Sequence, residues 1–324
     1  MKTISAIISM GFTMFAYAQT SKDTPRLQEA LERYPEADAD GDGVLTMEEA
    51  KAFREKADKP GRKNSGGKKK GRPADESVSQ IYKTVGKDKL ELYVSAPKGH
   101  KADAKVPAIV LFHGGGFSKG SPDSFLQHAE YLSNRGMVAI RVRYRLTSTP
   151  GVEVTDCIED AISAMRWVRA NAGKLGVDPD RIAAGGGSAG GYLSGATLMI
   201  DFINAKTDPP NVSAKPNALV LFSSAFGGHD KDGSPDPRNT DGKGILKNYI
   251  KPDQPPMMNF FGTEDPLYPV ARDFMEAYRK AGNSCELVTY EGAPHSFFMH
   301  GKYPDLTLDE TDKFLTGLGW LEKK

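Results

Sequence analysis

The sequence predicts an α/β fold, with a mostly parallel sheet flanked by helices and preceded by a small helical unit. From about residue 77 to the end, short apolar runs of strand length alternate with amphipathic helical segments. Runs that are apolar throughout indicate strands buried on both faces of a parallel sheet. A shift in composition near residue 76 separates this region from an acidic segment and a basic linker. A length of 324 residues accommodates one large domain with a small appendage.

Charge and cysteine content exclude some classes of partner. The formal net charge is +1, so it provides no global attraction to nucleic acid or to a membrane surface. The two cysteines, Cys157 and Cys285, lie far apart in the sequence, and we expect unpaired thiols in apolar surroundings. A disulfide between the two cysteines is the alternative, because an oxidising compartment would permit one.

Residues 1–18 are typical of a secretory signal peptide. Lys2 supplies the positive start, residues 4–15 are mostly apolar, and Ala16-Tyr17-Ala18 has the small-x-small pattern of a cleavage site. The apolar run is too short to span a bilayer, and no cysteine lies at the cleavage site to carry a lipid. We therefore expect an exported protein, periplasmic or secreted, that begins at Gln19.

An acidic loop at residues 38–49 forms the centre of a predicted helical unit over residues 19–56. Its sequence matches D-x-D-x-D-G-x5-E at every position. The oxygen ligands expected from this spacing are Asp38, Asp40, Asp42, the carbonyl of Val44, Thr46 and the bidentate Glu49. The loop and its flanking helices resemble an EF-hand, and the resemblance implies Ca²⁺ bound for a structural purpose. A single hand should bind Ca²⁺ weakly, and a merely solvated acidic turn is the alternative.

Residues 57–76 predict a basic flexible linker. The stretch is rich in Lys, Arg and Gly, includes Lys68-Lys69-Lys70 and has no apolar periodicity. A basic run can bind acidic polymers, but a solvated tether is the simpler interpretation. We place the catalytic domain at residues 77–324.

The order of elements in this domain follows from its apolar runs. The expected strands are 79–85, 90–95, 106–112, 137–144, 181–184, 218–223, 257–261 and 286–290. The expected helices are 124–135, 154–172, 192–200, 270–281 and 308–321. Active sites of such sheets gather at the carboxyl ends of the strands, so the loops there are the candidates for function.

A serine turn follows the strand at 181–184. Gly186, Ser188 and Gly190 fit G-x-S-x-G, a sharp strand-to-helix turn that exposes a serine hydroxyl above the sheet. The glycines are needed because side chains beside the serine would collide across the tight turn. The motif predicts that Ser188 is a nucleophile.

A second glycine turn, His113-Gly114-Gly115-Gly116, follows the strand at 106–112. Such a turn directs backbone N–H groups into a cavity, as one half of an oxyanion hole that the residue after the nucleophile completes. The expected donors are the amides of Gly115, Gly116 and Ala189.

A serine nucleophile also needs a base and an orienting acid. In proteins with a G-x-S-x-G turn of this kind, they follow the serine in the order acid, then histidine. His295 lies in the loop after the last strand, and His300 is the alternative base. The strand at 257–261 runs into Glu264 and Asp265, either of which could be the acid.

These motifs together resemble the α/β-hydrolase superfamily, in its hormone-sensitive-lipase-like and carboxylesterase branches, including feruloyl-esterase and acetyl-xylan-esterase types. The matching stretches are 113–116, 160–172, 178–182, 187–191, 262–266 and 295–297. The resemblance implies an α/β-hydrolase fold with Ser188 as nucleophile, Asp265 as acid and His295 as base. It gives His113 a role in shaping the glycine turn and places Trp167 in the core. The helical N-terminal cap of many lipase-like relatives is absent, which argues against long-chain lipids.

The expected function is a secreted serine esterase that needs no cofactor for catalysis. Acyl groups on carbohydrates and small soluble esters are the expected substrates, and the polar stretch 226–248 with His229 could bind sugar hydroxyls. The alternatives are a serine peptidase of prolyl-oligopeptidase type and a non-catalytic calcium-dependent binding protein. We expect no nucleic-acid partner and no membrane span, and the sequence leaves the oligomeric state open.

Overall fold

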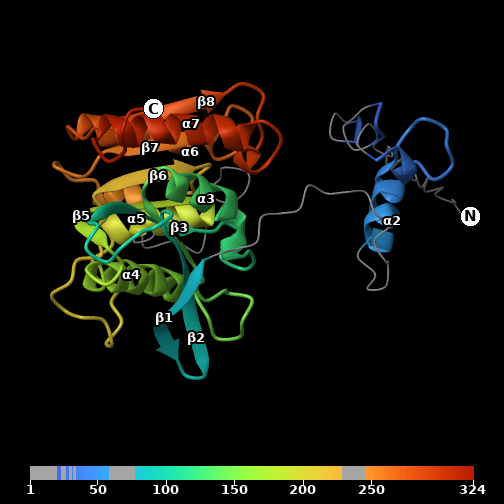
Figure 1. Ribbon diagram of the computed structural model, residues 1–324. Helices are drawn as coiled ribbons and strands as arrows, with labels where there is room; N and C mark the ends of the chain where they lie inside the picture. The colour runs from blue at the N-terminus through green and yellow to red at the C-terminus, as the bar shows by residue number, and fades with distance from the viewer. Residues whose placement is uncertain (1–19, 23–26, 29–30, 32–33, 58–76, 228–244) are drawn as a thin grey trace, which may run out of the picture. The chain divides into compact units, whose positions relative to one another are not determined.

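The computed structural model describes residues 20–22, 27–28, 31, 34–57, 77–227 and 245–324. The predicted signal peptide, nearly all of the basic linker and the stretch around His229 lie outside these residues. The chain divides into two compact units between Pro73 and Ala74, and each unit is described by itself (Figure 1). Within the described residues, no helix combines the length and apolarity needed to cross a bilayer.

The N-terminal unit contains η1 (Pro35–Ala37) and α2 (Met47–Ala57), which flank the acidic loop. Leu27, Ala37 and Leu45 are buried together in a small apolar cluster. The loop backbone also pairs with the residues just after the predicted cleavage site. The N–H of Ser21 donates to the Leu45 carbonyl at 2.8 Å, and the Leu45 N–H donates to Ser21 Oγ at 2.9 Å. The backbone N–H and carbonyl groups of Leu45, in the middle of the loop, are thus hydrogen-bonded to Ser21 of the same unit.

The C-terminal unit is built on an eight-stranded sheet with the order β1-β2-β4-β3-β5-β6-β7-β8. Its strands are β1 (Val78–Val85), β2 (Asp88–Ser95), β3 (Val106–Phe112), β4 (Val138–Val142), β5 (Val177–Gly187), β6 (Ala218–Phe222), β7 (Met257–Gly262) and β8 (Cys285–Tyr290). Pairing is antiparallel from β1 to β2 and from β2 to β4, and parallel across the remaining strands. The predicted α/β-hydrolase fold, with its mostly parallel sheet, is confirmed.

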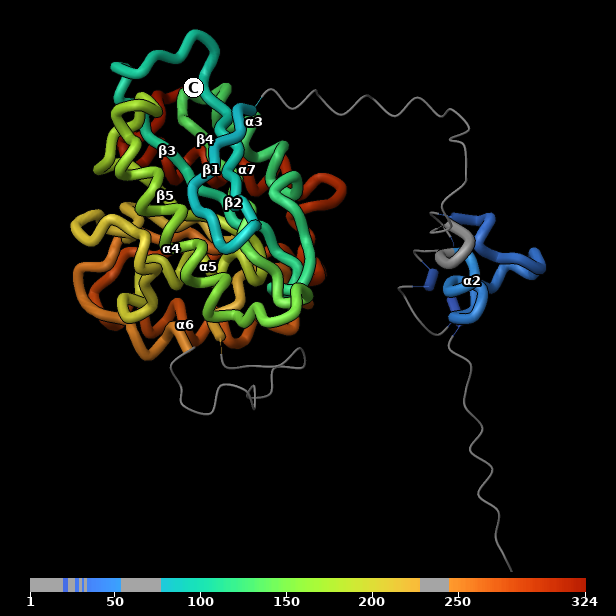
Figure 2. Tube along the Cα trace, turned by 90° about the horizontal axis from the view of Figure 1, so that it is seen from below, coloured from blue at the N-terminus to red at the C-terminus, as the bar shows by residue number. Residues whose placement is uncertain are grey.

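Helices cover both faces of this sheet, as Figure 2 shows. The helices are α3 (Leu126–Asn134), α4 (Val154–Ala170), α5 (Ala189–Met199), α6 (Tyr268–Lys280) and α7 (Tyr303–Gly317). One core cluster joins the sheet to α4, α5 and α6, and a second joins the opposite face to α3 and α7. Burial on both faces explains why β3, β4, β6 and β7 are apolar almost throughout.

Two boundaries differ from the sequence prediction in ways that matter for the site. We predicted a helix from residue 192, but α5 begins at Ala189, directly after the serine. Gly190 and Gly191 are weak helix formers, yet a Cβ on Gly190 would collide with the Phe112 carbonyl and one on Gly191 with Ser224. β5 is also longer than predicted at both ends, because Val177 already pairs with Val106 of β3 and Gly186 still pairs with Phe112.

The first strand forms one edge of the sheet. Its pairing register with β2 shifts between Ile81 and Lys83. Lys83 is 8% exposed, and its Nζ lies 2.7 Å from a carboxylate oxygen of Glu159 and 2.8 Å from one of Asp160. The bulge thus directs a lysine inward, onto acidic residues of α4.

Both cysteines are free thiols. Cys157 on α4 is buried, whereas Cys285 at the start of β8 is only partly buried. Trp167 is also partly buried and packs against the larger core cluster, as the sequence led us to expect.

Candidate active site

Ser188 occupies the turn between β5 and α5, in strained backbone geometry. Its φ of 53° and ψ of −118° lie outside the regions that serine normally adopts. The turn is possible because its neighbours lack side chains. A Cβ on Gly186 would stand 2.5 Å from the Phe112 carbonyl oxygen, and one on Gly190 would stand 2.0 Å from it. The sequence around Ser188 therefore holds its hydroxyl at the carboxyl edge of the sheet.

His295 and Asp265 meet Ser188 at this edge. The Nε2 atom of His295 lies 3.0 Å from Ser188 Oγ, and its Nδ1 lies 2.8 Å from Asp265 Oδ2. A carboxylate only accepts hydrogen bonds, so Nδ1 carries the proton and Nε2 is the acceptor for the serine hydroxyl. The structure thus brings together the three side chains predicted for a catalytic triad.

The two alternative residues lie differently. Glu264 is exposed, whereas Asp265 is 2% exposed and its other oxygen accepts the Leu267 N–H at 2.9 Å. His300 is exposed at the end of η4 (Phe297–Met299). The ring that reaches both Asp265 and Ser188 is that of His295.

The glycine loop, residues 113–120, packs directly on the serine turn. A Cβ on Gly114 would stand 2.9 Å from the Gly187 carbonyl oxygen and 3.3 Å from the Ser188 Cβ. Gly115 and Gly116 have φ values of 119° and 61°, in the region that favours glycine. Ala189 is the first residue of α5, so its N–H has no acceptor within its own helix. The expected oxyanion donors thus belong to two backbone segments that touch beside Ser188.

His113 fixes the direction of the first of these donors. Its Nδ1 lies 2.8 Å from the Gly114 carbonyl oxygen. The N–H of Gly115 belongs to the same planar peptide and points opposite to that carbonyl. Burial lowers the pKa of His113, so the ring is neutral at neutral pH, with its proton on Nδ1.

Tyr144, just after β4, supports His113 from behind. Its hydroxyl donates to the His113 carbonyl at 2.8 Å, and the two rings stack with centroids 4.3 Å apart. Both side chains are almost completely buried. The sequence analysis assigned Tyr144 only to the end of a strand, because nothing in its local pattern shows which residue lies behind the glycine loop.

The acidic loop brings three carboxylates together in the N-terminal unit. The carboxylates of Asp38, Asp40 and Asp42 offer oxygens within 4.8 Å of one another. The Glu49 carboxylate accepts hydrogen bonds from the backbone N–H groups of Ala39 and Thr46, at 3.1 and 3.0 Å, and the three aspartates also accept N–H groups of the loop. Carboxylate oxygens are among the ligands that Ca²⁺ prefers, and of the predicted ligands the structure groups these three aspartates.

Of the polar stretch predicted to bind sugar, the structure describes both ends. Phe226 is buried and stacks on Phe274 of α6, with centroids 4.0 Å apart. Leu246 is buried beside Gly195 of α5. These ends anchor the stretch to the core, and its middle, with His229, lies outside the described residues.

Comparison with known proteins places this geometry in a family. The BD-FAE family model matches residues 90–213. Esterase 2 of Thermogutta terrifontis is 38% identical, with a TM-score of 0.72, over 78% of this chain and 98% of that one. Its solved structures include forms phosphoramylated by tabun and bound to propionate.

Curated relatives match over less of their length. Carboxylesterase NlhH of Mycobacterium tuberculosis is 41% identical over 97 residues, which cover 29% of this chain and 30% of that protein. The probable isoprenylcysteine alpha-carbonyl methylesterase ICMEL1 of Arabidopsis thaliana is 24% identical over 245 residues, covering 67% of this chain and 50% of that protein. The chain thus spans half or less of the length of these two relatives. The solved esterase, by contrast, is matched over nearly its whole length, and the chain belongs with it to the α/β-hydrolase carboxylesterases.

Proposed function

We propose that the protein is an exported serine esterase that hydrolyses esters of short carboxylic acids through an acyl-enzyme. The observation that carries the proposal is the continuous hydrogen-bonded line from Asp265 through His295 to Ser188. In this assignment Ser188 is the nucleophile, His295 the base and Asp265 the acid.

The reaction follows from the positions of these atoms. His295 Nε2 removes the Ser188 hydroxyl proton as Oγ attacks the ester carbonyl, and the carbonyl oxygen gains negative charge. The amides of Gly115, Gly116 and Ala189 stabilise that charge. The C–O bond to the alcohol then breaks, and the leaving oxygen takes the proton from His295. Water, activated by the same ring, adds to the acyl-enzyme and releases the acid and Ser188.

A short acyl group is favoured by two observations. Among the described residues, β1 begins directly after Ser77, and no helix that could form an apolar lid stands between Ser77 and the first strands. Solved structures of the Thermogutta terrifontis esterase hold propionate and butyrate. Carbohydrate-linked acyl groups and small soluble esters both meet this requirement.

The test is hydrolysis of p-nitrophenyl esters of increasing chain length, by the wild-type protein and by Ser188→Ala. We expect turnover that is highest for acetate to butyrate and a loss of several orders of magnitude in the variant. Cleavage of a prolyl peptide substrate with no ester turnover would favour the peptidase alternative. No turnover on any ester would refute the esterase assignment.

We also propose that residues 1–18 direct export and are removed before Gln19. The positive start, apolar run and small-x-small site support this proposal. N-terminal sequencing of the protein from periplasm and medium tests it. A chain that is found in the cytoplasm with Met1 intact would contradict it.

Finally, we propose that the acidic loop binds Ca²⁺ for a structural purpose. The D-x-D-x-D-G-x5-E spacing and the three adjacent carboxylates support the proposal. Asp38, Asp40, Asp42, Thr46, Glu49 and the Val44 carbonyl would hold the ion. None of the catalytic steps passes through this loop, so no cofactor is needed for ester hydrolysis.

A further inference from the structure

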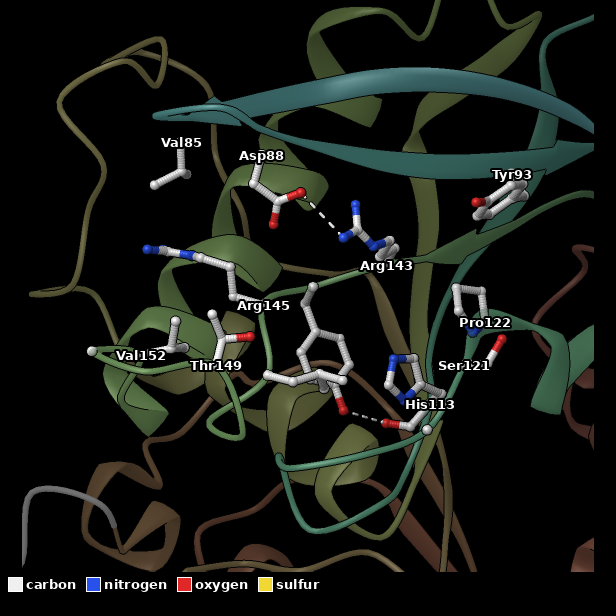
Figure 3. Close-up of a pocket in the computed structure, with 14 residues that line it drawn as sticks. Val85, Asp88, Tyr93, His113, Ser121, Pro122, Arg143, Arg145, Thr149 and Val152 are labelled. Atoms are coloured by element: carbon white, nitrogen blue, oxygen red, sulfur yellow. Dashed lines mark hydrogen bonds and ion pairs between the residues drawn. The ribbon is translucent and has the colours of Figure 1, made fainter. Parts of the chain in front are cut away.

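A polar cavity of about 490 Å³ borders the glycine loop on the side of β4 and β2 (Figure 3). His113 and Gly120 line it from the glycine loop, and Arg143 lines it just after β4. The described residues that line it include none of Ser188, Asp265 and His295. Its volume lies in the range of about 300–1,000 Å³ that small-molecule sites occupy. The cavity is therefore large enough for a ligand and separate from the triad.

The charges around this cavity compensate one another. Arg143 Nη2 lies 3.1 Å from a carboxylate oxygen of Asp88, and this pair is nearly half exposed. Arg145 is largely buried and forms ion pairs with three acidic residues of α4. Burial lowers the pKa of His113, so its ring adds no charge at neutral pH. Compensated charge favours a neutral ligand over an anion or a cation.

Hydrogen-bonding groups and apolar surfaces both line the cavity. His113 donates from Nδ1 to Gly114, which leaves Nε2 as the acceptor of the neutral ring. The Asp88 carboxylate and the Arg143 guanidinium add an acceptor and a donor on the opposite wall, as Figure 3 shows. The lining also contains side chains with apolar surface, namely Val85, Tyr93, Pro122, Leu146 and Val152. A sugar ring has this same composition, with hydroxyls at its rim and C–H groups on its faces.

We propose that this cavity is a glycosyl-binding site, which holds a sugar unit of a carbohydrate chain while an acyl group on that chain reacts at Ser188. The proposal rests on the esterase function proposed above and specifies its substrate class. Proximity supports it, because a Cβ on Gly114, next to His113, would stand 3.3 Å from the Ser188 Cβ. The glycine loop thus separates the cavity from the serine turn, and the proposal requires a chain longer than one sugar to cross this loop.

The kinetic test compares two acetate esters on the wild-type protein and on Arg143→Gln. p-Nitrophenyl acetate has no sugar, so its kcat/KM should stay within about twofold. The kcat/KM for an acetylated xylo-oligosaccharide should fall about tenfold, chiefly through KM, because a charge-assisted hydrogen bond is lost. Lys280→Gln on α6 is the matched control, since it also removes one partner of an exposed ion pair. It should change neither value.

Two kinetic results would overturn the proposal. An equal kcat/KM for the oligosaccharide ester in wild type and Arg143→Gln would show that the cavity does not contact substrate. An equal fall for both esters would show that the substitution acts through the glycine loop. A thermal unfolding curve of Arg143→Gln that matches wild type would exclude misfolding, as expected for an exposed pair.

Direct binding separates failure of this site from failure of the esterase function. Unsubstituted xylotetraose, cellotetraose and mannotetraose are titrated by calorimetry into Ser188→Ala, with and without Arg143→Gln. At least one should bind Ser188→Ala and lose about tenfold in affinity with Arg143→Gln. The site would be refuted if none of the three oligosaccharides bound, or if Arg143→Gln left their affinity unchanged. This measurement needs no turnover, so it stands even if no ester is cleaved.

Discussion

The hydroxyl of Tyr144 donates to the carbonyl oxygen of His113 at 2.8 Å, beneath two rings stacked 4.3 Å apart. The Nδ1–H of His113 in turn donates to the Gly114 carbonyl oxygen, which belongs to the same peptide group as the Gly115 N–H. The orientation of one proposed oxyanion donor thus depends on a residue that lies outside the catalytic triad. Tyr144 is a positioning residue in this sense.

Tyr144→Phe should lower kcat on p-nitrophenyl acetate by about tenfold with little change in KM. The loss should be smaller than the 10²–10³-fold effect of removing an oxyanion donor, because the donor is loosened rather than deleted. The free energy of unfolding should fall by about 1–3 kcal/mol, since the buried His113 carbonyl loses its donor. Steady-state kinetics and denaturant unfolding measure the two effects.

Tyr278→Phe is the matched control. Tyr278 is a buried residue of α6, and its hydroxyl donates to the Pro255 carbonyl at 2.8 Å. Its removal should cost similar stability with no change in kcat. A kcat for Tyr144→Phe equal to that of the control would show that the glycine loop keeps its orientation unaided.

Gly190→Ala should abolish activity, although alanine is the better helix former by about 1 kcal/mol. The added Cβ would stand 2.0 Å from the Phe112 carbonyl oxygen and 2.6 Å from that of His113. To relieve this contact, α5 must move away from the glycine loop and take Ser188 with it. Gly173→Ala has no atom within 4 Å of the added Cβ and should keep full activity. An active Gly190→Ala would show that the turn between β5 and α5 can shift without displacing Ser188 from its catalytic position.

Asp265→Asn should lower kcat by about 10⁴-fold while leaving the fold intact, because an amide no longer holds His295 in the required tautomer. Glu264→Gln, at the exposed neighbouring position, should keep activity within about twofold. Comparison of the two variants on p-nitrophenyl acetate identifies the acid. The opposite ranking would assign that role to Glu264.

Stability should depend on pH through His128 of α3. The ring is 2% exposed among Phe125, Phe222 and Phe298, and neither of its nitrogens finds a partner among the described residues. Burial lowers its pKa from 6.5 to about 4. Between these two values the unfolded chain binds the proton and the folded one does not, so stability is lost as pH falls from 6.5 to 4. The loss should total about 3 kcal/mol.

Unfolding midpoints in urea at pH 7 and pH 4.5 test this effect. His128→Leu should flatten the pH dependence over this window, because the only change is a buried group that no longer titrates. His300→Leu, at an exposed position, should keep the wild-type dependence. If His128→Leu loses as much stability as wild type on acidification, other groups cause the loss.

Removal of Ca²⁺ with EDTA should unfold the N-terminal unit and leave ester hydrolysis largely intact. Without the ion, the carboxylates of Asp38, Asp40 and Asp42 repel one another at close range. Limited proteolysis should then cut within residues 20–57, while kcat/KM on p-nitrophenyl acetate stays within about twofold. Loss of activity that added Ca²⁺ restores would show that the loop supports catalysis.

The parts of the structure that the sequence predicted are those set by local pattern. Strands buried on both faces are apolar throughout, and the glycines around Ser188 leave few backbone alternatives. The order of Ser188, Asp265 and His295 after the ends of β5, β7 and β8 follows from the parallel topology. These features required no knowledge of distant contacts.

The features that the sequence did not predict depend on contacts between distant segments. Tyr144 meets His113 only because β4 pairs with β3. The sequence pattern places the start of α5 three residues late, because Gly190 is a poor helix former. Nothing in the local pattern shows that the Phe112 carbonyl excludes a side chain at this position. The cavity beside the glycine loop needs the β1–β2 turn to fold over the end of β4. None of these three contacts produces a recognisable pattern within a single segment of the sequence.

The inward lysine of β1 has a consequence for behaviour at high concentration. A regular, exposed edge strand offers its backbone to another chain, and unpaired edges of this kind start aggregates. The register shift at Ile81 and Lys83 interrupts the flat run. The Lys83 ammonium group, buried against Glu159 and Asp160, ties this irregular stretch of β1 to α4. Lys83→Val would release that tie, so we expect the variant to polymerise through β1 more readily than the wild-type protein.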